Sequence, residues 1–143
     1  MTTTRHVARA RGATSASSPQ WRVELETGVH HLVADEPANM AGGDAGPTPI
    51  ELLLCSLAAC TAMTLRLYAE RKGWQLATID VSLDYDLDDE RGSIVRTITV
   101  PSEVPQDQRD RLADIAERTP VTLAIRGGTP IASTLRAEEI PTS

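Results

Sequence analysis

The chain has 143 residues, 41% of them hydrophobic and 24% charged, and this length and composition predict a single domain spanning residues 1–143. Its formal net charge of −6 argues against nucleic acid as the main partner, because phosphate binding needs a dense basic surface. Phe is absent and aromatic residues make up only 3%, so the core must consist of small aliphatic side chains. Such a core buries little area, which favours a homodimer.

The first third of the chain has the composition of strands and loops. Residues 1–12 form a possible first strand, followed by a Ser-rich loop to Gln20. Two short runs of β-forming residues, 21–25 and 30–34, flank a turn and predict a hairpin. The Gly- and Pro-rich segment 35–47 is a loop.

A long helix is predicted from about Pro49 to Lys72. Thr48 can act as the N-cap, and Glu51 can reach back to the backbone of Thr48, as in a capping box. Gly73 supplies a residue that tolerates the left-handed conformation at the end of the helix.

This helix is apolar or small on every face over its first four turns, which is typical of a helix buried on all sides. One domain of this size would struggle to surround it, whereas two copies packed together would cover it. Ala58, Ala59 and Ala62 would permit close approach of the two helices. The uncharged run from Leu52 to Leu65 is shorter than the ~20 apolar residues that span a bilayer, so no membrane partner is expected.

The second half of the chain predicts two paired strands, a helix, and a final strand. The expected segments are strands at 76–87 and 93–100, an amphipathic helix at 105–118, a short helical turn and loop at 119–130, and a strand at Ile131–Leu135. The element order is then βββ-α-ββ-α-β. Because the helices are separated by meandering strands, we expect an α+β fold.

Both cysteines, Cys55 and Cys60, lie in the long helix. Five residues of helix place them 140° apart around the axis and about 7.5 Å apart along it, which excludes an intramolecular disulfide. The spacing is also wrong for a helical metal pair, and the three histidines lack ligand spacing, so neither a metal nor another cofactor is expected. From this pattern alone, each cysteine is more often a small buried hydrophobe than a reactive thiol.

The stretch GPTPIELLLCSLAACTAMTLRLYAERKGW, from Gly46 to Trp74, resembles the OsmC/Ohr family of osmotically inducible and organic hydroperoxide resistance proteins. The resemblance continues through RLADIAERTPVTLAI and covers nearly the whole chain. It implies an intertwined homodimer in which two long central helices lie side by side, flanked by sheets. It also implies active sites at the subunit interface.

The resemblance distinguishes the two thiols. Cys60 matches the cysteine that attacks organic hydroperoxides in the family's peroxidases, whereas Cys55 falls where a small packing residue is common. The family tunes its thiolate with an Arg near the N-terminal strand and a Glu near the start of the helix. Arg11 is the nearest match for the Arg. Glu51 is one position away from the family's place for the Glu, and it already has a role in the capping box.

The chain departs from the family where a second, resolving cysteine is expected. The motif there reads Thr119-Pro120-Val121, and no cysteine follows Cys60. A peroxidase built on Cys60 would therefore use one cysteine and depend on an external thiol reductant.

Three hypotheses follow from these observations. The first is a cytoplasmic, thiol-dependent reductase of organic hydroperoxides that acts through Cys60, and two cysteines without a secretory signal fit that reducing compartment. The second is a dimer without turnover that binds a small apolar molecule or senses oxidants. The third is a structural stress protein without a site.

Overall fold

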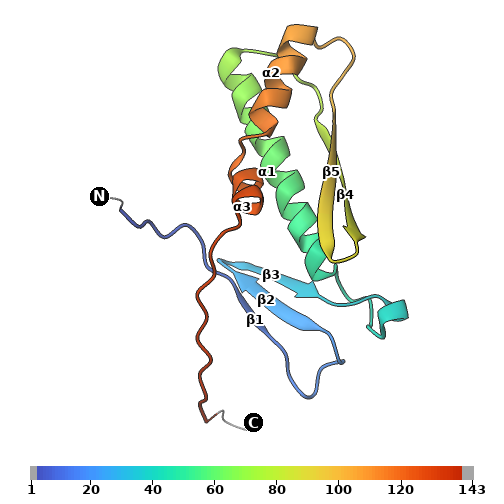
Figure 1. Cartoon of the computed structure of the whole chain (residues 1–143), viewed down its shortest axis with the longest axis vertical. Helices are drawn as coiled ribbons and strands as arrows, with labels where there is room; N and C mark the ends of the chain where they lie inside the picture. Colours follow the sequence, from blue (N-terminus) through green and yellow to red (C-terminus); the bar gives the residue numbers. More distant parts are fainter. Residues whose placement is uncertain (1–2, 140–143) are drawn as a thin grey trace. The chain divides into compact units, whose positions relative to one another are not determined.

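The computed structural model describes residues 3–139 and confirms the α+β class (Figure 1). In chain order the elements are β1 (Arg11–Ala13), β2 (Val23–Thr27), β3 (His30–Ala34), the 3-10 helix η1 (Ala38–Met40), α1 (Pro49–Lys72), β4 (Asp80–Asp88), β5 (Arg91–Thr99), α2 (Gln106–Ala116) and α3 (Pro120–Gly127). The chain forms two compact units. The first combines the residues up to Ala59 with 80–99, and the second combines 60–79 with the residues from Val100 onward.

The first unit contains a three-stranded antiparallel sheet in the order β1-β2-β3. The predicted hairpin is confirmed: β2 and β3 pair with Leu25 opposite Leu32, and Gly28 takes the left-handed conformation in their turn, at φ 58°. The predicted first strand is confirmed only at its end, because pairing with β2 begins at Arg11. Residues 3–10 have no regular structure, and the first two residues of that prediction lie outside the described range.

The predicted loop between β3 and α1 is organised around the buried side chain of Asp35. Its carboxylate accepts backbone N–H groups from Glu36 at 2.8 Å and from Ala45 at 3.1 Å. These backbone hydrogen bonds, first that of Glu36, lower the pKa of Asp35 below its ordinary value. Gly46 passes so close to β3 that a Cβ there would collide with the Val33 carbonyl. The loop is therefore held in one conformation by these contacts, and α1 begins directly after it.

The hairpin of β4 and β5 also belongs to the first unit. The strands pair from Asp80 opposite Thr99 to Asp88 opposite Arg91, and Asp89 in the turn has φ 54°. Half-buried and exposed residues alternate along much of both strands, as predicted. The first strand was expected to begin at Leu76, but Leu76 is buried in the second unit and pairing begins four residues later.

The ends of α1 form as the sequence predicts. Thr48 Oγ1 accepts the Glu51 N–H at 3.2 Å, and Glu51 Oε1 accepts the Thr48 N–H at 2.9 Å, which is a complete capping box. At the other end Gly73 has φ 70°, and the N–H groups of Gly73 and Trp74 return to the carbonyls of Glu70 and Ala69. This is the Schellman pattern.

The second unit contains most of the buried core. Its buried apolar residues are Leu65, Ala69, Leu76, Val104, Leu112 and Ala116. Arg111 of α2 donates to the hydroxyl of Tyr68 of α1 at 2.8 Å, and this hydrogen bond raises the pKa of Arg111. The Tyr68 ring also meets that of Trp74 edge-on, with centroids 5.6 Å apart. The second half of α1 and α2 are thus joined by apolar packing and one polar contact.

Much of α1 is left uncovered by its own chain. By length and composition the helix is apolar enough to cross a membrane, and only 17% of its most apolar window is buried. The burial on all sides that the sequence predicts for this helix is therefore not found in the described chain.

The predicted final strand is wrong. Residues 129–139 contain no strand, and Ile131 and Leu135 are 89% and 96% exposed. A strand requires a neighbour for its backbone hydrogen bonds. Within residues 3–139 no strand pairs with this segment, so its β-forming residues do not produce a strand. The end of the predicted order is corrected to two successive helices, α2 and α3.

Candidate functional site

Cys60 lies on α1 at the start of the second unit and is half-buried. Its sulfur accepts the backbone N–H of Val121, with 3.5 Å between nitrogen and sulfur. The two residues are 61 positions apart in sequence, so the contact depends on how α3 is placed within this unit. An N–H directed at sulfur stabilises negative charge there, and the thiolate is the nucleophilic form of cysteine.

The start of α3 leaves one backbone donor for this contact. The first N–H groups of a helix have no partner within the helix. Pro120 at the first helical position has no N–H, and the N–H of Thr122 is accepted by Thr119 Oγ1 at 3.3 Å. The N–H of Val121, between them, is the donor that reaches Cys60. The sequence Thr-Pro-Val-Thr thus directs a single donor toward the thiol, at the positive end of the helix dipole.

Thr119, at the place where the resemblance predicts a resolving thiol, is fully buried. Its hydroxyl lies 2.7 Å from Thr122 Oγ1, and Thr122 Oγ1 donates to the carbonyl of Ala116 at 3.3 Å. Because the proton of Thr122 is directed at Ala116, Thr119 donates its own proton to Thr122 and accepts the Thr122 N–H. The Thr119 hydroxyl is therefore committed to capping α3.

An exposed apolar stripe runs along α1 through Cys60. Leu53, Met63 and Leu67 are 37%, 70% and 49% exposed. With Ser56 and Cys60 they are spaced at alternating intervals of three and four residues, the repeat of a helix–helix seam. Cys60 is in line with these exposed residues but is itself half-buried, with its sulfur against the start of α3.

Cys55 differs from the expectation that it packs in a core, because it is exposed in the chain. The 140° between the two positions on the helix separates it from the Cys60 side, which rests against α3. Helix geometry alone could place the thiols on different faces, but could not show which face the rest of the chain covers.

The two charged candidates lie in the first unit, whereas Cys60 lies in the second. Arg11 is on β1, and one of its guanidinium nitrogens lies 3.8 Å from a carboxylate oxygen of Glu26 on β2, with both side chains exposed. The carboxylate of Glu51 is engaged in the capping box, as its sequence context predicts. The roles that the resemblance assigns them beside the thiolate stay predictions.

The histidines take part in no metal constellation. Among residues 3–139, no three His, Cys, Asp or Glu side chains are placed to hold a metal ion. His31 Nε2 lies 2.6 Å from Glu24, whose other oxygen accepts from Arg22 at 2.8 Å. These hydrogen bonds, first that of Arg22, lower the pKa of Glu24. The group is a surface ion-pair cluster.

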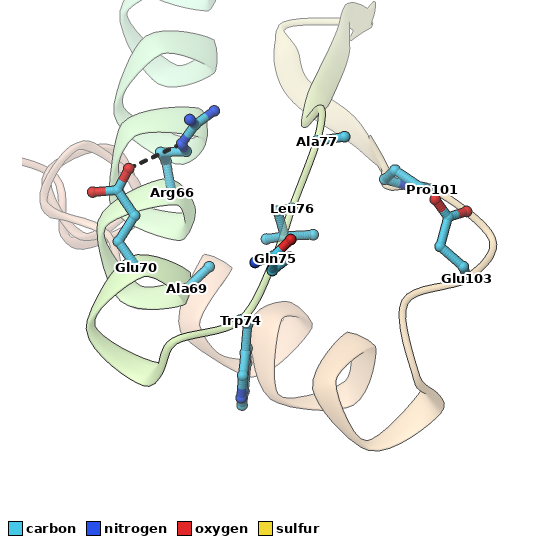
Figure 2. Close-up of a pocket in the computed structure, with 9 residues that line it drawn as sticks. All are labelled: Arg66, Ala69, Glu70, Trp74, Gln75, Leu76, Ala77, Pro101 and Glu103. Carbon is cyan, nitrogen blue, oxygen red and sulfur yellow. Dashed lines mark hydrogen bonds and ion pairs between the residues drawn. The ribbon is translucent and has the colours of Figure 1, made fainter.

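A cleft of about 530 Å³ lies in the second unit beside the C-terminal turns of α1 (Figure 2). Its wall includes the ion pair between Arg66 Nε and Glu70 Oε1, 3.2 Å apart, together with Trp74, Gln75 and Glu103. No thiol lines this cleft. The reactive chemistry that the sequence predicts is at Cys60 and not in the cleft.

The fold and this site define a class of α+β protein that carries a thiol on a long, Pro-initiated helix. The sequence profile of OsmC-like proteins matches residues 42–134, which is more than half of the chain. The chain belongs to this family, as its resemblance in sequence predicts. No protein with a curated description matches the chain.

Solved structures from three bacteria share the fold. An organic hydroperoxide resistance protein OsmC from Legionella pneumophila has a TM-score of 0.65 and 19% identity, covering 87% of this chain and 93% of its own. The organic hydroperoxide resistance protein OhrB of Bacillus subtilis has a TM-score of 0.59 and 21% identity, covering 86% and 93%. An OsmC-like protein from Mycoplasma pneumoniae has a TM-score of 0.68 and 15% identity, covering 88% and 92%. At such identities the likeness establishes the fold alone.

Proposed function

We propose that this protein is a one-cysteine, thiol-dependent peroxidase that reduces organic hydroperoxides through Cys60. The observation that carries the proposal is the half-buried thiol of Cys60 with a backbone N–H directed at its sulfur. The names of the structural relatives, two of which are organic hydroperoxide resistance proteins, support the choice of substrate class.

The first step is attack of the Cys60 thiolate on the distal oxygen of the hydroperoxide. A sulfur–oxygen bond forms and the oxygen–oxygen bond breaks, giving a sulfenic acid on Cys60 and an alkoxide that takes a proton from water. Sulfur is oxidised by two electrons and the peroxide is reduced by two. The Val121 N–H stabilises the anionic sulfur before the attack. The apolar stripe beside Cys60 suits a substrate with a hydrophobic organic group.

The second step requires thiols from outside the chain, because the residue at the expected resolving position is Thr119. One external thiol attacks the sulfenic sulfur and releases water, leaving a mixed disulfide. A second thiol, or the second sulfur of a dithiol, breaks that disulfide and restores the Cys60 thiol. One turnover thus consumes one hydroperoxide and two thiols and yields an alcohol, water and an external disulfide. Low-molecular-weight thiols are abundant in the cytoplasm, which is where we place the protein.

The exposed stripe on α1 supports a homodimer as the working form. A 24-residue helix whose apolar face is open to water would gain burial by packing against a second copy. The stripe passes through Cys60, so the dimer would enclose the thiol and provide the substrate with an apolar environment.

The second hypothesis, a dimer that binds a small apolar ligand or senses oxidants without turnover, is favoured by one observation. Thr119 is buried and its hydroxyl both donates and accepts a hydrogen bond, so a structural residue stands where a resolving thiol would complete the catalytic cycle. A sensor would form the sulfenic acid once and keep it, even with excess dithiol present.

Sulfenate trapping tests the proposal. The protein would be exposed briefly to cumene hydroperoxide in the presence of dimedone, and both cysteine peptides would be analysed by mass spectrometry. We expect the dimedone adduct on Cys60 and a much smaller amount on Cys55. Absence of an adduct on Cys60 would overturn the peroxidase. An adduct that forms but is not discharged by dithiothreitol would favour the sensor.

A further inference from the structure

We propose that Thr119 is a positioning residue for Cys60: its side chain fixes the start of α3 so that the Val121 N–H stays directed at the sulfur. This inference rests on the proposed function, because it assigns a role within the same site. Thr119, which stands where a resolving cysteine is expected, would then contribute to the reactivity of Cys60.

Thr119 is the centre of the hydrogen bonds that form the start of α3. The hydroxyl accepts the N–H of Thr122 at 3.3 Å and donates to Thr122 Oγ1 at 2.7 Å. The Thr119 carbonyl also accepts the N–H of Leu123 at 3.0 Å, closing the first turn of the helix. The hydrogen bonds of Thr119 therefore span Val121 and fix the two residues that follow it, while the Val121 N–H is left for Cys60.

The two threonines at the start of α3 are buried. Thr119 is 0% exposed, and Thr122 is 5% exposed. A buried, doubly hydrogen-bonded hydroxyl cannot turn away to water, so the helix start cannot shift without breaking those bonds. The N–H of Val121 is thus held at a fixed place within the first turn of α3.

The Thr119 hydroxyl also has no proton left to donate to a thiolate. Its proton is used on Thr122, and its oxygen accepts a backbone N–H. It can influence Cys60 only through the placement of α3, which makes it a positioning residue and not a catalytic one.

The experiment measures alkylation of Cys60 by iodoacetamide in a Cys55→Ser background, in which Cys60 is the only thiol. The variants are Thr119→Val, which keeps the shape and removes the hydroxyl, and Thr119→Ser, which keeps the hydroxyl. At about pH 7 we expect Thr119→Val to react about tenfold more slowly, which is the effect of one hydrogen bond to a charged group, and Thr119→Ser to react like the parent. At about pH 10, where an unassisted thiol is ionised, all three proteins should react alike.

This pair of pH values separates positioning from a merely structural role. If Thr119→Val only frayed α3, Cys60 would be more exposed and its alkylation would be faster at both pH values, which would overturn the proposal. Equal rates for Thr119→Val and the parent at about pH 7, or a slower rate at both pH values, would overturn the proposal. If Thr119→Val fails to fold, Thr119→Gly replaces it, because helix starts tolerate glycine at the cap better than other residues without a side-chain acceptor.

A parallel reaction with cumene hydroperoxide distinguishes failure of this inference from failure of the proposed function. If the parent forms no sulfenate but the alkylation rates differ as expected, Thr119 positions the N–H in a protein that is not a peroxidase. If the parent forms sulfenate and the alkylation rates are equal, the peroxidase stands and the role of Thr119 is overturned.

Discussion

The backbone N–H of Val121 is directed at the sulfur of Cys60, with 3.5 Å between nitrogen and sulfur. It is available because Pro120 has no N–H and the N–H of Thr122 is bound by the Thr119 side chain. This relationship joins two segments of the second unit that are 61 residues apart in sequence. It gives the thiol a source of anion stabilisation that depends on no charged side chain.

The apolar stripe on α1 predicts a dimer that a single charge can disrupt. We expect Met63→Lys to shift the protein from dimer to monomer at micromolar concentration, because the charge would be buried between two helices. Sedimentation velocity measures the change. Val29→Lys is the matched control, since Val29 is 96% exposed in the turn between β2 and β3. A stable monomer for the unaltered protein would contradict the prediction.

The capping box at the start of α1 predicts a measurable contribution to stability. Thr48→Ala removes the side-chain acceptor of the Glu51 N–H, and we expect it to lower the free energy of unfolding by about 1 kcal/mol. Urea denaturation gives the value. In a double-mutant cycle with Glu51→Ala, the two losses should not add, because each side chain caps the backbone of the other. Fully additive losses would show that the two contacts are independent.

The lowered pKa of Asp35 predicts a pH-dependent contribution to stability. A carboxyl whose pKa is lower in the folded protein stabilises it above the ordinary value of 3.8, and that stabilisation is lost as the pH falls through the lowered value. Asp35→Asn should therefore be less stable than the unaltered protein at neutral pH, and the difference should shrink in acid. Urea denaturation at several pH values measures this. A difference that stays constant down to about pH 2 would contradict the account.

Introducing a thiol at position 119 should convert the one-cysteine mechanism into a two-cysteine mechanism. In a Cys55→Ser background, Thr119→Cys should give a disulfide with Cys60 after one equivalent of hydroperoxide, in place of the dimedone adduct. Intact-protein mass spectrometry detects the loss of two hydrogens. Persistence of the adduct without a disulfide would show that position 119 does not meet the sulfenic sulfur.

The elements defined by local sequence were predictable, because their determinants lie within a few residues. The two ends of α1 follow from Thr48, Glu51 and Gly73, each of which forms the expected contact. The same signal starts α3, where Thr119 and Pro120 repeat the Thr-Pro start of α1. The sequence predicts only a short helical turn there, whereas α3 runs from Pro120 to Gly127. Gly128 ends the helix in the left-handed conformation, at φ 66°, and a glycine at this place is a recognisable signal for a helix end.

Features that depend on distant parts of the chain could not be predicted. The segment at Ile131–Leu135 has β-forming residues but no neighbouring strand among residues 3–139, so its local composition was misleading. The contact between Cys60 and Val121 spans 61 residues, and no spacing in the sequence indicates it. The exposure of Cys55 likewise depends on which face of α1 the rest of the chain covers.

The central claim is that Cys60 alone carries the turnover of organic hydroperoxide. The most direct measurement is consumption of cumene hydroperoxide with excess dithiothreitol by the unaltered protein, by Cys60→Ser and by the matched control Cys55→Ser. The account predicts that Cys60→Ser falls to the rate of dithiothreitol alone while Cys55→Ser keeps the full rate. Turnover by Cys60→Ser equal to that of the unaltered protein would contradict it.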